Sequence, residues 1–91
     1  MRTIDRASAF KRDYKREAKG QHRSTLDNDL KPVLVALATD QPLDTKYRDH
    51  DLSGDWAGYR ECHVKPDLLL IYRKSDALRL ARLGSDSELF G

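Results

Sequence analysis

Residues 59–83 read YRECHVKPDLLLIYRKSDALRLARL, and this segment predicts most of a β-sheet. It contains three runs rich in strand-forming residues, from Tyr59 to Val64, from Leu68 to Arg73 and from Ala77 to Leu83. The runs are separated by Lys65-Pro66-Asp67 and Lys74-Ser75-Asp76, which are typical of tight turns between antiparallel strands. Because the middle run is almost entirely apolar, we expect it to be a central strand that is covered on both faces.

Two amphipathic helices are expected before these strands. The first should run from residue 7 or 8 to Gly20, with apolar residues at every fourth position: Phe10, Tyr14 and Ala18. Ser24-Thr25-Leu26-Asp27 resembles a capping box, which would begin a second helix. Pro32 should kink that helix. Its apolar positions keep the helical period: Leu26, Leu30, Val33, Leu34 and Leu37.

With a short strand at residues 2–5, the expected order of elements is β-α-α-β-β-β. The predicted fold class is therefore α+β, a helical hairpin packed on an antiparallel sheet, in one domain that covers residues 1–91.

A long loop is expected between the second helix and the strands. The segment 39–58 is rich in turn-forming residues, and its apolar residues follow neither the helical nor the strand period. A loop of this length is usually functional in a compact domain, and Tyr47, Leu52 and Trp56 are expected to anchor it.

Length and composition exclude several classes of protein. The chain has 91 residues, of which 38% are hydrophobic and 35% are charged, so the core is expected to be thin. The longest apolar run, residues 33–38, is too short to span a membrane, and the N-terminal residues contain no apolar signal stretch. Cys62 stands alone and cannot form an intrachain disulfide. These features predict a cytoplasmic protein without membrane association.

Charge is distributed unevenly, although the formal net charge is only +2. Residues 1–24 carry eight basic and three acidic side chains, whereas residues 25–57 carry three and seven. Lys11, Lys15 and Lys19 form a basic stripe on the first expected helix. Such a stripe suits a polyanion such as RNA, and it also suits a solvated helix face.

Several titratable groups could carry phosphodiester chemistry. They are His50, His63, Asp67 and Asp86, with Arg60 and Arg82 as cations on strands. RNA cleavage needs one group to accept the 2′-hydroxyl proton, one to protonate the 5′-oxygen and a cation for the developing charge. Taken singly, each of these residues could equally be a surface or hydrogen-bonding residue.

A metal site is the competing use of the same side chains. Cys62 and His63 are adjacent on a strand and should face opposite sides of the sheet, so they are poor ligands for one ion. No CxxC, HExxH, Walker or GxGxxG pattern occurs, and neither a metal nor another cofactor is expected. Cys62 should be a small buried side chain. Among the aromatic residues, Phe90 is expected to be free to stack on a base.

The segment from Tyr47 to Tyr72, together with Arg82 to Phe90, closely resembles the YafQ branch of the RelE-type toxins. It is similar to the family string DH-L-G-W-GYR--HV-PD--LIY and to its ending R-GSH-LF. The resemblance implies the RelE-like microbial ribonuclease fold. It also implies the toxin of a type II toxin–antitoxin system, an mRNA interferase that cuts messenger RNA on the ribosome without a metal and is silenced by a cognate antitoxin.

The resemblance also implies roles for particular residues. His50, His63 and Asp67 match active-site positions of the family, and Arg60 and Arg82 match basic strand positions that face RNA. Phe90 matches the family's C-terminal aromatic and is expected to contact RNA. Lys11 and Lys15 of the basic helix are added as RNA contacts. The implied reaction is attack of the 2′-hydroxyl on the adjacent phosphate, which gives a 2′,3′-cyclic phosphate and a 5′-hydroxyl. We expect His50, His63 and Asp67 to share one basic surface that is bordered by Arg60 and Arg82.

Asp86 departs from the family pattern, which has a catalytic His in its GSH segment. An ordinary aspartate has a pKa of about 3.9, so at neutral pH it donates no proton and repels phosphate. Three hypotheses follow: an endoribonuclease attenuated at Asp86, a catalytically inactive module that binds RNA or antitoxin, and a plain interaction domain. The resemblance separates the first two from the third.

Overall fold

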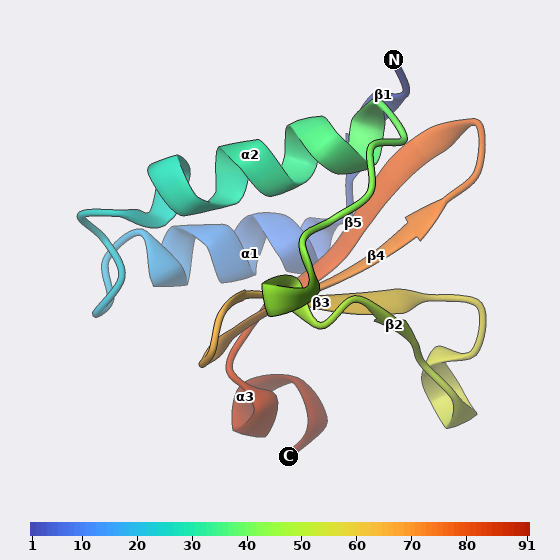
Figure 1. The fold of residues 1–91 in the computed structure, drawn as a ribbon. Helices are drawn as coiled ribbons and strands as arrows, with labels where there is room; N and C mark the ends of the chain where they lie inside the picture. The colour runs from blue at the N-terminus through green and yellow to red at the C-terminus, as the bar shows by residue number, and fades with distance from the viewer.

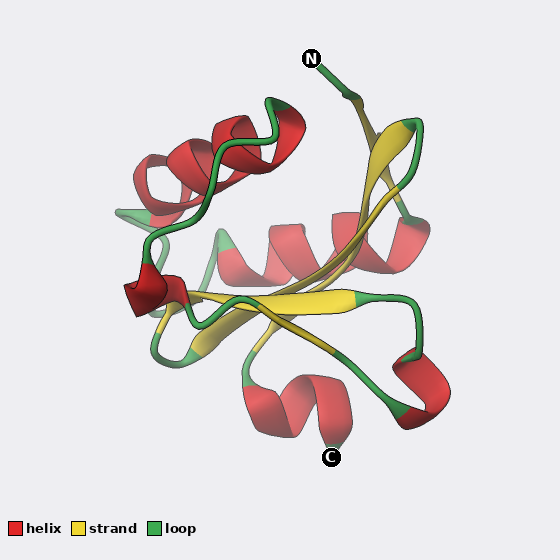
Figure 2. Cartoon of the chain, turned by 45° about the vertical axis from the view of Figure 1, so that its right-hand side comes forward, coloured by secondary structure: helices red, strands yellow, loops and turns green.

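The computed structural model describes all of residues 1–91, and its strands form one sheet in the order β1-β5-β4-β3-β2 (Figure 1). The strands are β1 (Thr3–Arg6), β2 (His50–Asp51), β3 (Arg60–Lys65), β4 (Leu68–Lys74) and β5 (Ala77–Gly84). The helices are α1 (Ser8–Glu17), α2 (Leu26–Ala38) and α3 (Asp86–Phe90), with short 3₁₀ turns η1 (Thr45–Tyr47) and η2 (Gly54–Trp56). Figure 2 shows α1 and α2 on one side of the sheet and α3 on the other.

The predicted α+β class and the order of the main elements are confirmed, but the sheet is mixed. Strands β2 to β5 pair antiparallel, as expected, whereas β1 runs parallel to β5. The parallel pair arises because β1 is followed by the two helices and joins the sheet beside the last strand. Strand β2 and helix α3 were not predicted, since two and five residues are too few to show a period.

The main core lies between the two long helices and the sheet. Cys62 is fully buried there, as predicted. Helix α2 passes through Pro32 and contributes most of the helical core residues. The buried side chains of this core are Phe10, Leu26, Leu30, Val33, Leu37, Ala38, Cys62, Val64, Leu68, Leu70, Tyr72, Leu78, Leu80 and Leu83.

The buried face of α1 matches the predicted one only in part. Phe10 is buried, but Ala18 is exposed and lies at the end of the helix. Asp13 and Glu17 are buried instead, at three and seven residues after Phe10. Tyr14 is half-buried and packs against the main core. The predicted apolar stripe is therefore confirmed at Phe10 and Tyr14 and wrong at Ala18, and the buried face also includes the ion-paired Asp13 and Glu17.

The predicted capping box at Ser24 is also wrong. Helix α2 begins at Leu26, and Thr25 at its N-cap makes no side-chain hydrogen bond to the helix. The structure has its capping box at α3, where Ser85 accepts from the Glu88 N–H and Glu88 accepts from the Ser85 N–H. This reciprocal pair allows a helix of only five residues to form at the end of the chain.

A second, smaller core covers the face of the sheet that is remote from α1 and α2. Leu69 and Ile71 of β4 pack there against Ala81 of β5 and Leu89 of α3, with Leu52, Trp56 and Tyr59 around them. Strand β4 is therefore covered on both faces, as its apolar sequence predicted. None of the helices is long and apolar enough to cross a membrane.

Candidate active site

The sheet face opposite α1 and α2, here called the site face, carries a row of paired residues across four strands. Arg82 pairs with Ile71, Ile71 pairs with Glu61, and Glu61 pairs with His50. Residues that pair across neighbouring strands share a face of the sheet. Because His63 lies two residues after Glu61 on β3, its side chain is on the site face as well.

His50, Glu61 and His63 form one polar cluster on this face. The two imidazole rings have centroids 6.5 Å apart. Glu61 lies between them, with one carboxylate oxygen 3.7 Å from His50 Nε2 and the other 3.4 Å from His63 Nε2. Residue 61 is only 6% exposed. The predicted sharing of one surface by the two imidazoles is confirmed, and a buried carboxylate joins them.

The tautomer of His50 follows from its second contact. Its Nδ1 lies 2.7 Å from the carbonyl oxygen of Arg48. Since a carbonyl oxygen only accepts, Nδ1 carries a proton and donates it, which leaves Nε2 as the nitrogen that faces Glu61. Nε2 is therefore the atom of this ring that can take up or release a proton at the site face.

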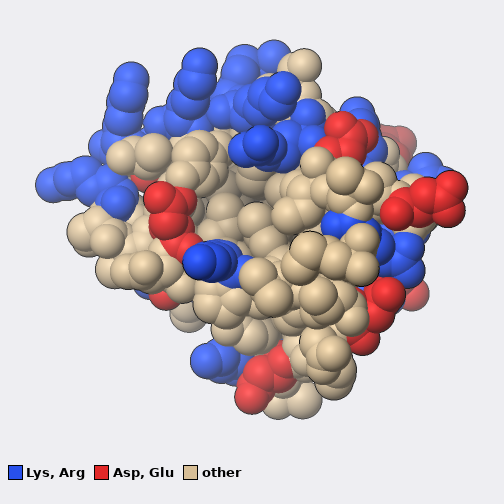
Figure 3. All heavy atoms as spheres, turned by 90° about the horizontal axis from the view of Figure 1, so that it is seen from above, with Lys and Arg blue, Asp and Glu red and all other residues tan.

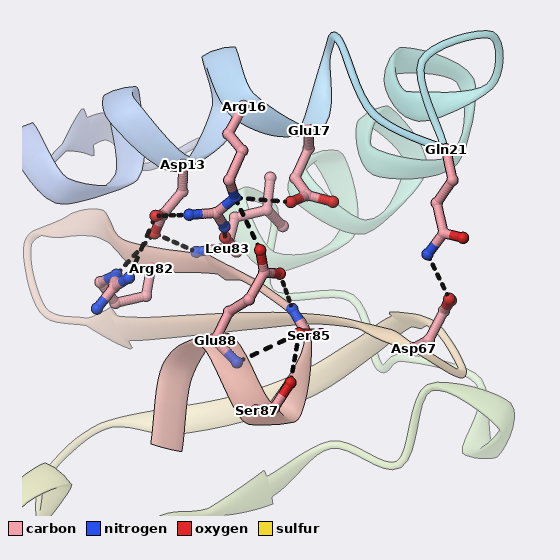
Figure 4. A network of polar contacts seen from close by, with 10 residues as sticks. All are labelled: Asp13, Arg16, Glu17, Gln21, Asp67, Arg82, Leu83, Ser85, Ser87 and Glu88. Atoms are coloured by element: carbon pink, nitrogen blue, oxygen red, sulfur yellow. Dashed lines mark hydrogen bonds and ion pairs between the residues drawn. The ribbon is translucent and has the colours of Figure 1, made fainter. Parts of the chain in front are cut away.

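Arg82 is held at the edge of β5 by Asp13 of α1 (Figure 4). Arg82 Nε and Nη2 donate to the two Asp13 oxygens at 2.7 and 3.2 Å. Burial by itself raises the pKa of Asp13, but the hydrogen bonds from Arg82 and the Leu83 N–H, and the charges of Arg82 and Arg16, outweigh it and leave that pKa below its ordinary value. Asp13 is thus an ionised partner for Arg82.

Helix α3 is tied to α1 through Arg16 and Glu88. Arg16 Nε lies 3.1 Å from a Glu88 oxygen, and Arg16 Nη2 donates to the Leu83 carbonyl at 2.9 Å. The Ser85 N–H lowers the pKa of Glu88, and the charge of Arg16 acts in the same direction. Asp86, at the first position of α3, is exposed, and Phe90 is 44% exposed near its end. Figure 4 shows how these contacts link the two helices across β5.

Asp67 is not brought to the two imidazoles, contrary to expectation. Its carboxylate accepts from Gln21 Nε2 at 3.0 Å and lies 3.1 Å from His22 Nε2, both in the loop between α1 and α2. No contact joins Asp67 to His50 or His63. The β3–β4 turn directs this side chain toward the helical layer, because Gln21 and His22 offer it partners there.

The expectation that Arg60 borders the same surface as the imidazoles is wrong. Arg60 immediately precedes Glu61 on β3, so its side chain lies on the helical side of the sheet. It donates to Asp49 at 2.7 Å, to Asp51 and to the Tyr72 hydroxyl. The hydrogen bond that Arg60 donates to Asp49, and after it the one to Tyr72, raise the pKa of Arg60. Asp49 also accepts from the Tyr72 hydroxyl, so this cluster fastens the segment just before His50 to the sheet.

Lys11 and Lys15 are exposed on α1, in the helical layer rather than on the site face. Figure 3 shows Lys and Arg side chains gathered along one side of the molecule, beside a hollow of uncharged atoms. An apolar groove of about 450 Å³ lies between β1, α1 and α2. Its lining includes three exposed apolar side chains: Met1, Ile4 and Val35.

Comparisons with known proteins identify the family. A family model described as "Bacterial toxin of type II toxin-antitoxin system, YafQ" matches residues 2–91. The chain belongs to the YafQ family of bacterial toxins. It is 39% identical over 93 residues to the mRNA interferase toxin YafQ of Escherichia coli strain K12, which covers 100% of this chain and 98% of that protein.

Solved structures of the YafQ family share the fold. The crystal structure of YafQ from E. coli strain BL21(DE3) is 39% identical, covers 100% of both chains and gives a TM-score of 0.86. YafQ in the E. coli DinJ–YafQ toxin–antitoxin complex gives a TM-score of 0.83 at 39% identity, over 99% of this chain and 98% of that one. The fold and the family that the sequence resemblance implied are confirmed.

Glu61 and Asp13 belong to the site but were not predicted from the sequence. Glu61 could have been found, because it precedes His63 by two residues on a predicted strand and must share its face. Asp13 gave a weaker signal, as an acidic residue three positions after Phe10 in an otherwise basic helix. No cluster of three or more His, Cys, Asp or Glu side chains is arranged to hold a metal ion.

Proposed function

We propose that this chain is the toxin of a type II toxin–antitoxin pair and an endoribonuclease that cleaves messenger RNA on the ribosome. One observation carries the proposal: two imidazoles on one sheet face, with a buried carboxylate between them, in a chain 39% identical along its whole length to an mRNA interferase toxin. Residues 1–91 act as one domain, and the place of action is the cytoplasm, where messenger RNA is translated.

The proposed mechanism is acid–base cleavage by the protein's own side chains. One imidazole of the His50–His63 pair accepts the 2′-hydroxyl proton, and the 2′-oxygen attacks the adjacent phosphorus. The bond from phosphorus to the 5′-oxygen breaks, and the other imidazole supplies a proton to the leaving oxygen. The products are a 2′,3′-cyclic phosphate and a 5′-hydroxyl. Arg82 stabilises the charge that develops on the phosphorane oxygens.

The remaining candidate residues receive different roles. Phe90, half-exposed at the end of α3, offers a ring on which a base can stack. Asp67 orients the β3–β4 turn through Gln21, and Arg60 fastens the segment before His50 through Asp49. Asp86 takes the place of a His that, in the family pattern, adds a third proton-exchanging group, and its exposed carboxylate repels phosphate, so cleavage by this chain is slow.

The partner is a cognate antitoxin, and the complex is a hetero-oligomer. YafQ of E. coli forms such a complex with DinJ. In this chain, the exposed lysines Lys11 and Lys15 lie on α1, one of the elements that form the apolar groove. An acidic antitoxin segment with apolar side chains complements both features.

The experiment is a paired cleavage assay on translating ribosomes with this chain and its Asp86→His variant. An imidazole at position 86 restores a group that exchanges protons near neutral pH, and one such group is worth about 10²–10⁴-fold in rate. Asp76→His is the matched control, because Asp76 is exposed in the β4–β5 turn. Unfolding curves should be alike for all three proteins.

The alternative is a catalytically inactive module that binds RNA or antitoxin, which the loss of the family His at position 86 favours. If neither this chain nor Asp86→His cleaves while both bind ribosomes or antitoxin, that alternative is correct. Equal cleavage by this chain and Asp86→His would show that the side chain at position 86 takes no part in cleavage, which would then depend on His50 and His63.

A further inference from the structure

Strand β5 has an open edge beyond the end of β1, and α1 closes it with side chains. Strand β1 pairs only with residues 77–80 of β5. Further along this edge lie the backbone groups of Leu83, whose N–H donates to Asp13 at 3.0 Å and whose carbonyl accepts from Arg16. Asp13 and Arg16 therefore take the place that a longer β1 would occupy.

Asp13 does more than close this edge. Its side chain is 4% exposed, and its two oxygens accept four hydrogen bonds, from Arg82 Nε, Arg82 Nη2, Arg16 Nη1 and the Leu83 N–H. A carboxylate offers about four acceptor positions, so Asp13 is saturated. Two of the four bonds go to Arg82, which the closure of the strand edge does not require.

The geometry leaves part of the Arg82 guanidinium free. Asp13 engages Nε and Nη2, while Nη1 makes no hydrogen bond within the protein. The Arg82 side chain is 27% exposed, and Arg82 stands at one end of the row that leads through Ile71 and Glu61 to His50. A planar guanidinium group that is held by two of its nitrogens cannot rotate, so the direction of its third nitrogen is fixed.

We propose that Asp13 is a positioning residue for RNA cleavage, which holds the Arg82 guanidinium so that Nη1 is presented to the reacting phosphate. The inference rests on the proposed function and deepens it. Asp13 touches no substrate and acts only through Arg82. A hydrogen-bond donor that is already in position stabilises the charge of the transition state without moving during the reaction. A mobile arginine binds the phosphate of the substrate and of the transition state equally well, and equal binding does not raise the rate at saturation.

Glu17 provides a matched control on the same helix face. It is nearly as buried as Asp13, and it also binds Arg16, with its oxygen 3.0 Å from Arg16 Nε. It makes no contact with Arg82. Both residues can stabilise the packing of α1, but only Asp13 orients Arg82.

The experiment compares Asp13→Asn, Glu17→Gln, Arg82→Gln and the Asp13→Asn/Arg82→Gln double variant. Single-turnover cleavage on translating ribosomes is measured in this chain and in the Asp86→His background. Asp13→Asn should lower the rate at saturation about 10- to 100-fold, the cost of a misplaced group. The concentration for half-saturation should not rise, because the substitution removes a negative charge and RNA binding gains from that.

The double variant shows whether Asp13 acts through Arg82. Once Arg82 is lost, Asp13→Asn should add nothing, so the double variant should cleave as slowly as Arg82→Gln and no slower. A rate that falls by the product of the two single effects overturns the proposal. Equal losses in Asp13→Asn and Glu17→Gln also overturn it, since both then reflect the folding of α1.

A second readout separates this proposal from the proposed function. If no variant cleaves RNA, including Asp86→His, the proton–nitrogen NMR signal of Arg82 Nε still reports its carboxylate partner. That signal should be shifted and protected from exchange in this chain and in Glu17→Gln, and it should move to the position of a free arginine in Asp13→Asn. An unchanged Arg82 signal in Asp13→Asn overturns the assignment.

Discussion

Glu61 links the imidazoles of His50 and His63. It is buried, and its two oxygens face His50 and His63 separately. A buried carboxylate is costly unless its oxygens have polar partners, and the two imidazoles lie beside these oxygens. Glu61 therefore fixes how the two imidazoles lie relative to each other.

Glu61→Gln is expected to slow cleavage about 10-fold or more, because the amide cannot face both imidazoles as an acceptor and their orientation is lost. Single-turnover rates on translating ribosomes provide the measurement, beside unfolding curves. Asp51→Asn is the control, since Asp51 is the next residue after His50 but binds Arg60 on the opposite face. A rate for Glu61→Gln as high as that of Asp51→Asn would show that the carboxylate is not required.

Helix α1 has two faces with separate tasks. Its inner face carries Asp13 and Glu17, which bind Arg16 beside β5 and α3. Its outer face carries Lys11 and Lys15, which are exposed and have no acidic partner. Substitutions on the outer face should therefore change association with a partner and leave the fold intact.

The Lys11→Glu/Lys15→Glu double variant should bind the cognate antitoxin with an association rate about 10- to 100-fold lower, most strongly at low salt. Stopped-flow or surface-binding kinetics at two ionic strengths measure it. Arg23→Glu/Lys46→Glu changes the net charge equally on two loops and should lower the rate much less. Equal effects of the two double variants would indicate steering by net charge alone and remove α1 from the antitoxin interface.

At the scale of the whole molecule, ion pairs link elements that are distant in sequence. Asp13 joins α1 to β5, Glu88 joins α3 to α1, and Asp29 lies 2.8 Å from Lys65 between α2 and β3. The pKa of each of these carboxyl groups lies below its ordinary value, in Asp29 chiefly because of the hydrogen bond from Lys65. Ionisation of these three carboxyl groups therefore stabilises the folded state.

The stability of this chain should fall in acid. A carboxyl group with a lowered pKa in the folded state stabilises it above the unfolded pKa, at about 4, and this contribution is lost as the pH falls through the folded-state value. Urea unfolding followed by circular dichroism between about pH 3 and 7 measures it. Asp13→Asn should be less stable than this chain at pH 7 and should lose less on acidification. Parallel pH curves for the two proteins would contradict the assignment.

Local patterns in the sequence determined most of the fold. The three runs in residues 59–83 and the helical periods before them specify strands and helices, because backbone geometry sets these periods within one element. The alternation along β3 likewise determines that Glu61 and His63 share a face. The motif between Tyr47 and Tyr72 identified the family.

Which distant side chains meet depends on the packing of the elements in three dimensions. Strand β1 pairs only with residues 77–80 of β5, and Asp13 of α1 lies at the open end of β5, where it binds Arg82. Asp67 and Arg60 turn away from the imidazoles because they find partners in the helical layer and in the loop before β2. These outcomes depend on how elements pack against one another, and no period along the chain encodes that packing.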